Sequence, residues 1–196
     1  MSVQSVDLLY GRGELSVQLP PGAHAHVVSK PDFPQASSAD QVYRQAMDNP
    51  LDCDELDLLC KGCGSACILI CDITRPVPNH VFLQPMIRTM IASGISASQI
   101  TVLIATGLHR PNEGDELDEL IGDPWVTQNI RVVNHFARND DDHVTIGRTK
   151  TRGTVVRLDR RFVDADIRIA TGLVEPHFMA GYSGGRKVIA PGLAHA

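Results

Sequence analysis

The sequence contains few aromatic residues, no long apolar run and no cluster of basic residues. Aromatic side chains make up 5% of its 196 residues. No apolar stretch approaches the roughly 20 residues that a membrane-spanning helix needs. The 18 Lys and Arg residues are outnumbered by 23 Asp and Glu residues, which gives a formal net charge of −5. These absences argue against both a membrane and a nucleic acid as partners.

A secretory signal is also missing. The first residues, MSVQSVDLLYGRGEL, have neither the basic segment nor the apolar segment of such a signal. An apolar fraction of 43% at this length suits one globular domain with a sizeable core. We therefore expect a soluble, cytoplasmic protein in which residues 1–196 form a single domain, and the sequence does not indicate its oligomeric state.

The five cysteines lie close together, and their number is odd. Without a secretory signal, an odd number argues against a disulfide framework. The spacing of the last four could suit a metal or an iron–sulfur cluster, although it does not follow the ferredoxin order. Two of them stand at the ends of an apolar run that is typical of a buried strand. In such a strand cysteine acts as a small apolar residue, and we favour that interpretation. The five are Cys53, Cys60, Cys63, Cys67 and Cys71.

Short β segments and two helices are predicted before residue 66. Alternating apolar residues predict edge or hairpin strands on either side of Pro20-Pro21-Gly22. Acidic residues open two later segments of helical character. The predicted strands cover residues 15–19 and 24–28, a loop covers 31–38, and the helices cover 40–47 and 54–60.

From residue 66 onward, continuous apolar runs alternate with helical patterns. Such runs are typical of strands covered on both faces. A helix predicted for residues 80–92 contains Pro85, where we expect it to begin or bend. The alternation predicts an α/β fold with a mostly parallel, Rossmann-like doubly wound sheet. The other predicted elements are strands at 66–71, 100–105, 130–133, 154–156 and 166–170 and a helix around 113–121.

Chemically active side chains follow three of these strands. Asp72 and Arg75 follow the first strand, and His109 follows the second. His177 and a glycine-rich loop that ends in Lys187 come after the third. Because ligands bind beyond the carboxyl ends of parallel strands, we expect all of these residues at one rim of the sheet.

Each of these residues also has an ordinary structural explanation. A turn cap would equally explain Asp72, and a surface position would explain Arg75. His109 and His177 differ from the other histidines because each lies near a glycine and a proline just past a buried strand, where a stiff loop would fix a general base. The other histidines, which we expect to be surface or core residues, are His24, His26, His80, His135, His143 and His195.

The glycine-rich loop does not match the common nucleotide-binding motifs. Walker A places glycine directly before its lysine, whereas Arg186 occupies that position here, and the dinucleotide pattern is absent. Ser183, Gly184 and Gly185 remain as small residues whose N–H groups could cradle an anion, with a plain turn as the alternative. Lys187 would add a point charge or a nucleophile. The residue pattern thus predicts a small anionic ligand and names no reaction.

Three blocks of the sequence resemble the nickel-dependent lactate racemase family in its N-terminal domain. Their order and separation also match, so the resemblance spans nearly the whole chain. The blocks are residues 72–78 (DITRPVP), 104–111 (IATGLHRP) and 175–192 (EPHFMAGYSGGRKVIAPG), with a weaker match at Tyr10-Gly11.

The resemblance implies a cofactor and a reaction. The cofactor is a nickel-pincer nucleotide, a pyridinium mononucleotide whose sulfur arms hold nickel, attached to a lysine. One histidine would take the hydroxyl proton of a small 2-hydroxy acid such as lactate, while hydride moves from C2 to the cofactor. Hydride return to the other face, with the opposite histidine as the acid, would invert the centre. The implied residues are His109 and His177 for catalysis, Arg75 for the substrate carboxylate, and Lys187, Asp72, Ser183, Gly184 and Gly185 for the cofactor.

The resemblance also implies features outside this sequence. The family's nickel-ligating histidine lies somewhat downstream of the lysine, and His195 is too close to Lys187 to match it. We therefore expect residues 1–196 to be a truncated N-terminal catalytic domain without the C-terminal domain, a fragment that need not be active alone. Two other hypotheses stay open: a non-catalytic fragment or small-anion-binding module, and an iron–sulfur protein built on the cysteines.

Overall fold

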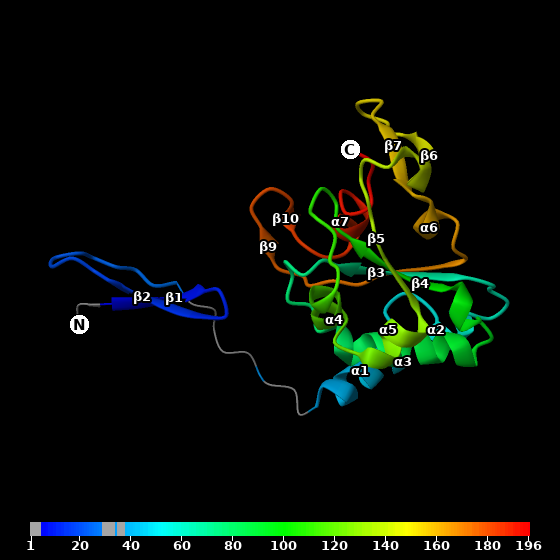
Figure 1. The fold of residues 1–196 in the computed structure, drawn as a ribbon, viewed down its shortest axis with the longest axis horizontal. Helices are drawn as coiled ribbons and strands as arrows, with labels where there is room; N and C mark the ends of the chain where they lie inside the picture. The colour runs from blue at the N-terminus through cyan, green and yellow to red at the C-terminus, as the bar shows by residue number, and fades with distance from the viewer. Residues whose placement is uncertain (1–4, 29–33, 35–37) are drawn as a thin grey trace. The chain divides into compact units, whose positions relative to one another are not determined.

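Four parallel strands form the central sheet in the computed structural model of the protein, which describes residues 5–28, 34 and 38–196 (Figure 1). Their order across the sheet is β5-β4-β3-β8. The chain runs from β3 to β4 and β5 on one side, then returns to β8 on the other side of β3. Connections therefore diverge beside β3, which creates a crevice at its carboxyl end. The strands are β3 (Ala66–Cys71), β4 (Ile100–Ala105), β5 (Arg131–Asn134) and β8 (Ile167–Ala170).

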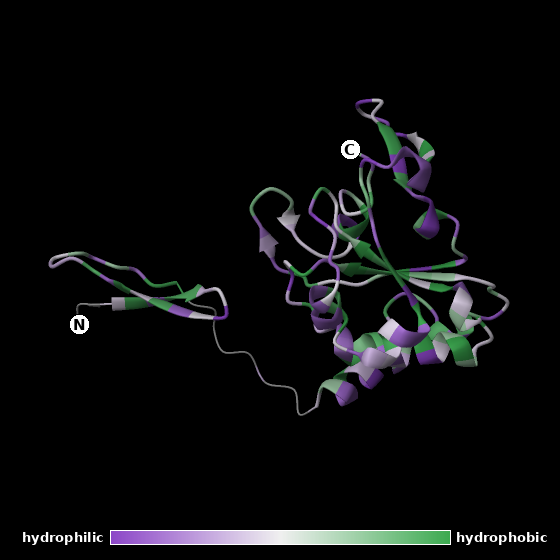
Figure 2. Cartoon of the chain, viewed as in Figure 1, coloured by the Kyte–Doolittle hydropathy of each residue, from purple (hydrophilic) through white to green (hydrophobic). Residues whose placement is uncertain are grey.

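Helices cover both faces of this sheet, which confirms the predicted α/β class. Because side chains alternate along a strand, Ile68 and Ile70 pack into one core while Cys67 and Leu69 pack into another on the opposite face. Figure 2 shows the central strands as apolar. In the described part of the chain, no helix has the length and apolar character needed to cross a membrane. The first core is covered by α1 (Ala39–Asp48), α2 (Leu56–Leu59), α3 (Asn79–Ala92), α4 (Asp115–Ile121) and α5 (Pro124–Asn129), and the second by α6 (Arg160–Val163) and α7 (Arg186–Ile189).

Most helices and strands from residue 66 onward follow the sequence prediction. The strands predicted for residues 66–71 and 100–105 coincide with β3 and β4. Helix α3 runs through Pro85 instead of beginning there, because Leu83 and Ile87 on either side of it are fully buried against the sheet. Helix α5 was not predicted, although the sequence carries its start signal: the side chain of Asp123 accepts hydrogen bonds from the N–H groups of Trp125 and Val126, and Pro124 follows the cap.

The strand predicted for residues 154–156 was wrongly assigned to the parallel sheet. It is the start of β7 (Val155–Asp159), which pairs antiparallel with β6 (His143–Arg148) in a separate two-stranded sheet. The short connection between them, residues 149–154, explains the difference. Parallel strands need a crossover of roughly a dozen residues or more, whereas a short turn can join only antiparallel strands.

The N-terminal strands also differ from the prediction. The described residues before residue 37 belong to a unit separate from the rest of the chain. In it, β2 (Gly13–Gln18) pairs with β1 (Ser5–Tyr10), and residues 24–28 form no strand. The turn of this hairpin contains Gly11 at φ +58°, a conformation that favours glycine. The loop predicted for residues 31–38 lies mostly outside the described residues.

The cysteines do not converge on a common site. Cys60 packs in the first core and Cys67 in the second, so the sheet separates them. Burial, reinforced by the charge of Asp159, raises the pKa of the Cys67 thiol to about 12. Cys53 is exposed. Among the described residues, no three His, Cys, Asp or Glu side chains are arranged to hold a metal. The structure therefore offers no support for the iron–sulfur hypothesis.

Candidate active site

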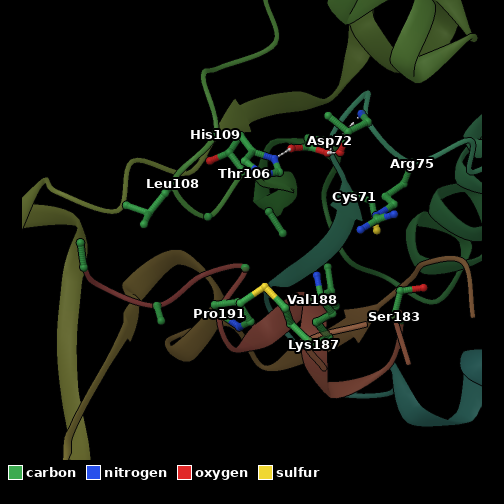
Figure 3. A pocket seen from close by; sticks show the side chains of 18 of the residues that line it. Cys71, Asp72, Arg75, Thr106, Leu108, His109, Ser183, Lys187, Val188 and Pro191 are labelled. Carbon is green, nitrogen blue, oxygen red and sulfur yellow. Dashed lines mark hydrogen bonds and ion pairs between the residues drawn. The ribbon is translucent and has the colours of Figure 1, made fainter. Parts of the chain in front are cut away.

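A cavity of about 470 Å³ lies at the carboxyl ends of β3 and β4. Its wall is completed by α7 and by the C-terminal residues 191–196. In Figure 3, Asp72 and His109 lie on one side of the cavity, and Lys187 and Pro191 lie across from them. The cavity thus forms at the sheet edge where the sequence predicted a site, and its size is that of a small-ligand pocket.

Asp72 and His109 form a hydrogen-bonded pair in this cavity. The Asp72 carboxylate is buried, and its Oδ2 lies 2.5 Å from Nδ1 of His109. Its other oxygen accepts hydrogen bonds from the N–H and the hydroxyl of Thr74, at 3.2 and 2.5 Å. The His109 side chain remains 63% exposed. A buried carboxylate therefore orients an imidazole that solvent and ligands can reach.

Arg75 lies on the same wall and is paired with an acid. Its Nη1 donates to Oε1 of Glu175 at 2.9 Å, and both side chains are partly exposed. Glu175 follows β8, so the pair links the ends of two adjacent parallel strands. An anionic ligand that binds Arg75 must share this guanidinium with Glu175 or displace it.

Lys187 reaches the cavity from α7, next to the glycine-rich loop. The hydroxyl of Ser183 is occupied by the segment that follows β8: it donates to the Leu173 carbonyl at 2.6 Å and accepts from the Glu175 N–H at 3.1 Å. A Cβ on Gly184 would lie 3.0 Å from the Leu173 carbonyl oxygen. Ser183 and Gly184 both line the cavity, whereas space beside Gly185 is open. The loop is thus packed tightly against the segment that follows β8.

His177 is held differently from the other predicted site residues. It ends β9 (Pro176–His177), which pairs with β10 (Gly181–Tyr182). Its Nδ1 accepts hydrogen bonds from the N–H groups of Met179 and Ala180, at 3.3 and 3.2 Å. Met179 lines the cavity, but His177 is not among the lining residues. The structure therefore brings Asp72, His109, Arg75 and Lys187 to one cavity and leaves His177 in the hairpin beside it.

Three histidines that we expected to be ordinary surface or core residues form a cluster at the C-terminal wall of the cavity, and one of them, His195, lines the cavity. The rings of His135 and His143 lie 5.0 Å apart, and those of His143 and His195 lie 4.9 Å apart, both edge to face. Nδ1 of His135 lies 3.2 Å from Asp159 Oδ2, and its Nε2 lies 3.3 Å from the Ala194 carbonyl. The cluster supports the C-terminal wall of the cavity. Its members come from three segments, so only the position of His135 just past a strand hinted at it.

Acidification is expected to destabilise this cluster. His143 Nδ1 donates to the Asn139 carbonyl, and its Nε2 is buried without a partner among the described residues. Burial lowers the pKa of His143 below its ordinary 6.5, so the unfolded chain binds a proton more readily than the folded chain. The folded protein therefore keeps its full stability above pH 6.5, the ordinary pKa of histidine. It loses stability as the pH falls from there through the lowered pKa of folded His143. Urea unfolding should therefore show a smaller free energy at about pH 5 than at about pH 7.

Replacing His143 with phenylalanine is expected to reduce that pH dependence, because the variant has no titrating group at this position. The exposed His24→Phe variant serves as the control and should keep the slope of the unsubstituted protein. Equal slopes for all three proteins would contradict the assignment of the pH dependence to His143.

Comparisons with known sequences point to one family. The family model for the lactate racemase N-terminal domain matches residues 10–196. A lactate racemase from Lactiplantibacillus plantarum is 31% identical over 192 residues, which are 97% of this chain and 45% of that relative. A lactate racemase from Thermoanaerobacterium thermosaccharolyticum is 32% identical over 192 residues, 97% of this chain and 44% of that relative. The chain thus spans less than half of the length of these relatives.

Solved structures agree with the sequence comparisons. The lactate racemase apoprotein from Thermoanaerobacterium thermosaccharolyticum superposes with a TM-score of 0.81 at 32% identity, covering 97% of this chain and 44% of that chain. A crystal structure of a Thermotoga maritima protein superposes with a TM-score of 0.58 at 22% identity, covering 71% of this chain and 36% of that chain. The second likeness concerns the fold alone.

Proposed function

This chain belongs to the lactate racemase N-terminal domain family, and on that premise we propose that it carries the catalytic residues of a 2-hydroxy acid racemase that acts on lactate. The Asp72–His109 pair is the observation that carries the proposal. A site that only binds anions needs cations such as Arg75 and Lys187. A carboxylate-supported imidazole beside those cations adds a group that can accept and return a proton. This pair favours the enzyme over the alternative, a small-anion-binding module.

The proposed cofactor is the nickel-pincer nucleotide, and the cavity fits a group of this kind. The cavity volume of about 470 Å³ lies within the range of small-molecule and cofactor sites. Lys187 and Arg75 bring two cationic side chains to the cavity for a phosphate or carboxylate group, whereas Gly185 is not among the lining residues. Lys187 would attach the cofactor, with Asp72, Ser183 and Gly184 beside it. Because the Ser183 hydroxyl is occupied by Leu173 and Glu175, we assign that residue to loop geometry and not to a direct hydroxyl contact.

The residues of the chain divide the remaining work. Arg75 would bind the substrate carboxylate through parallel hydrogen bonds once Glu175 shares or yields its guanidinium, which fixes the position of C2. His109 would take the hydroxyl proton at Nε2, with Asp72 stabilising the imidazolium. His177 would serve the opposite face of the substrate. When bound, the cofactor would supply the acceptor for the C2 hydride.

Interconversion of lactate enantiomers tests this function. A protein that contains residues 1–196 and is loaded with the nickel-pincer nucleotide should convert either pure enantiomer of lactate toward an equal mixture. Chiral chromatography measures the two enantiomers over time. The same protein without cofactor is the control and should leave the enantiomer unchanged. Saturable lactate binding without interconversion in the loaded protein would support the binding module instead.

A further inference from the structure

The Nδ1 atoms of the two proposed catalytic histidines have different hydrogen-bond partners. Nδ1 of His109 faces a carboxylate oxygen, whereas Nδ1 of His177 faces two backbone N–H groups. A neutral imidazole carries one proton on one ring nitrogen and a lone pair on the other. The partner of Nδ1 therefore decides whether Nε2 presents a proton or a lone pair to a ligand.

For His109 the partner requires a proton on Nδ1. Asp72 Oδ1 already accepts from the N–H and the hydroxyl of Thr74, so this carboxylate is oriented as an acceptor. Its Oδ2, 2.5 Å from Nδ1 of His109, also accepts. Nε2 of His109 is then left with the lone pair, and it has no hydrogen-bond partner within the described residues.

For His177 the partners require the opposite arrangement. The N–H groups of Met179 and Ala180 can only donate, so Nδ1 of His177 must hold the lone pair. The ring proton of His177 is then on Nε2. A neutral ring with its proton on Nδ1 instead would place that hydrogen against two donor hydrogens, so the turn selects the Nε2–H tautomer.

We propose that the fold sets the two histidines in opposite tautomers, His109 with an accepting Nε2 through Asp72 and His177 with a donating Nε2 through the turn at residues 179–180. Asp72 is then the positioning residue for His109. The chemical meaning rests on the proposed function. His109 is ready to receive a hydroxyl proton: the substrate O–H bond breaks, the Nε2–H bond forms, and the new positive charge lies beside Asp72. His177 is ready to donate a hydrogen bond to a substrate oxygen, and it can accept a proton at Nε2 only if its ring turns over or the turn opens.

Long-range ¹H–¹⁵N NMR of the histidine-labelled chain without cofactor measures both tautomers directly. Loss of one ring pattern in His109→Gln and another in His177→Gln assigns the two residues. At a pH where both rings are neutral, the expected result is a protonated Nδ1 for His109 and a protonated Nε2 for His177. The same tautomer in both residues, or the reverse assignment, would overturn the proposal.

The Asp72→Asn variant tests the positioning role. Thr74 would keep the amide oxygen as its acceptor, so the new NH₂ group would face His109 and drive the ring proton from Nδ1 to Nε2. The His109 pattern should invert while the His177 pattern stays unchanged. The exposed Asp115→Asn variant has the same chemical change and should alter neither pattern. An unchanged His109 in a folded Asp72→Asn protein would contradict the role of Asp72.

These measurements separate the proposal from the proposed function. Both tautomers are observed without cofactor or lactate, so they can have the expected pattern in a protein that proves to be a binding module. Conversely, a loaded protein that interconverts lactate with both histidines in the same tautomer would keep the racemase and refute the asymmetry.

Discussion

Replacing Lys187 with alanine is expected to abolish covalent attachment of the nickel-pincer nucleotide. Lys187 is half-buried on α7 and reaches the cavity beside Ser183 and Gly184, where an amine can bond to an electrophilic group. A methyl side chain can form no such bond. Intact-mass spectrometry after loading should show the cofactor mass on the unsubstituted chain and the bare mass on the variant.

Two further variants separate a tether from a point charge. Lys187→Arg keeps the positive charge but removes the nucleophilic amine, so it should also remain at its bare mass. The exposed Lys150→Ala variant should load normally. A cofactor adduct on the Lys187→Ala chain would refute the tether, and an adduct on the Lys187→Arg chain would show that attachment does not use this amine.

Removing either proposed catalytic histidine is expected to slow lactate interconversion strongly. A positioned general acid or base contributes roughly 10²–10⁴-fold to a rate, and His109→Ala or His177→Ala should lose an effect of that size. The His109 side chain is largely exposed, so its loss should leave the fold unchanged. Initial rates from each pure enantiomer, measured by chiral chromatography on the loaded protein, provide the readout.

The control for these two variants is His26→Ala, which removes an exposed histidine from the N-terminal unit. It should retain the unsubstituted rate. Far-ultraviolet circular dichroism of all three variants checks that the sheet and helices persist. If His109→Ala and His177→Ala both keep the unsubstituted rate, neither histidine takes part in the proton transfers.

The sequence predicted the central sheet better than its surroundings because burial on both faces leaves a pattern. β3 and β4 are almost entirely apolar, and their apolar runs coincide with the bounds of both strands. β6 and the N-terminal hairpin are largely exposed, so their sequences need no continuous apolar run. The pairing of β6 with β7 depends on a short turn, which the apolar pattern does not encode.

The candidate site shows the same division. Position after a strand of the parallel sheet pointed to Asp72, Arg75, His109 and Lys187, because parallel strands bring their carboxyl ends to one rim. This held even for Lys187, although β8, the strand before it, is a partly exposed edge strand. The same rule selected His177, yet the β9–β10 hairpin leaves that residue outside the cavity lining. The hairpin is a local structure with its own hydrogen bonds, which strand position alone could not predict.

The sequence by itself determined the kinds of chemical group in this protein and the strand ends from which they come. Only the tertiary structure decided their partners: Asp72 for His109, Glu175 for Arg75, and backbone N–H groups for His177. The first two contacts join residues far apart in the chain, so the register of β3 with its neighbours sets them. The partner decides where an imidazole carries its proton, and spacing along a sequence contains no information about that choice.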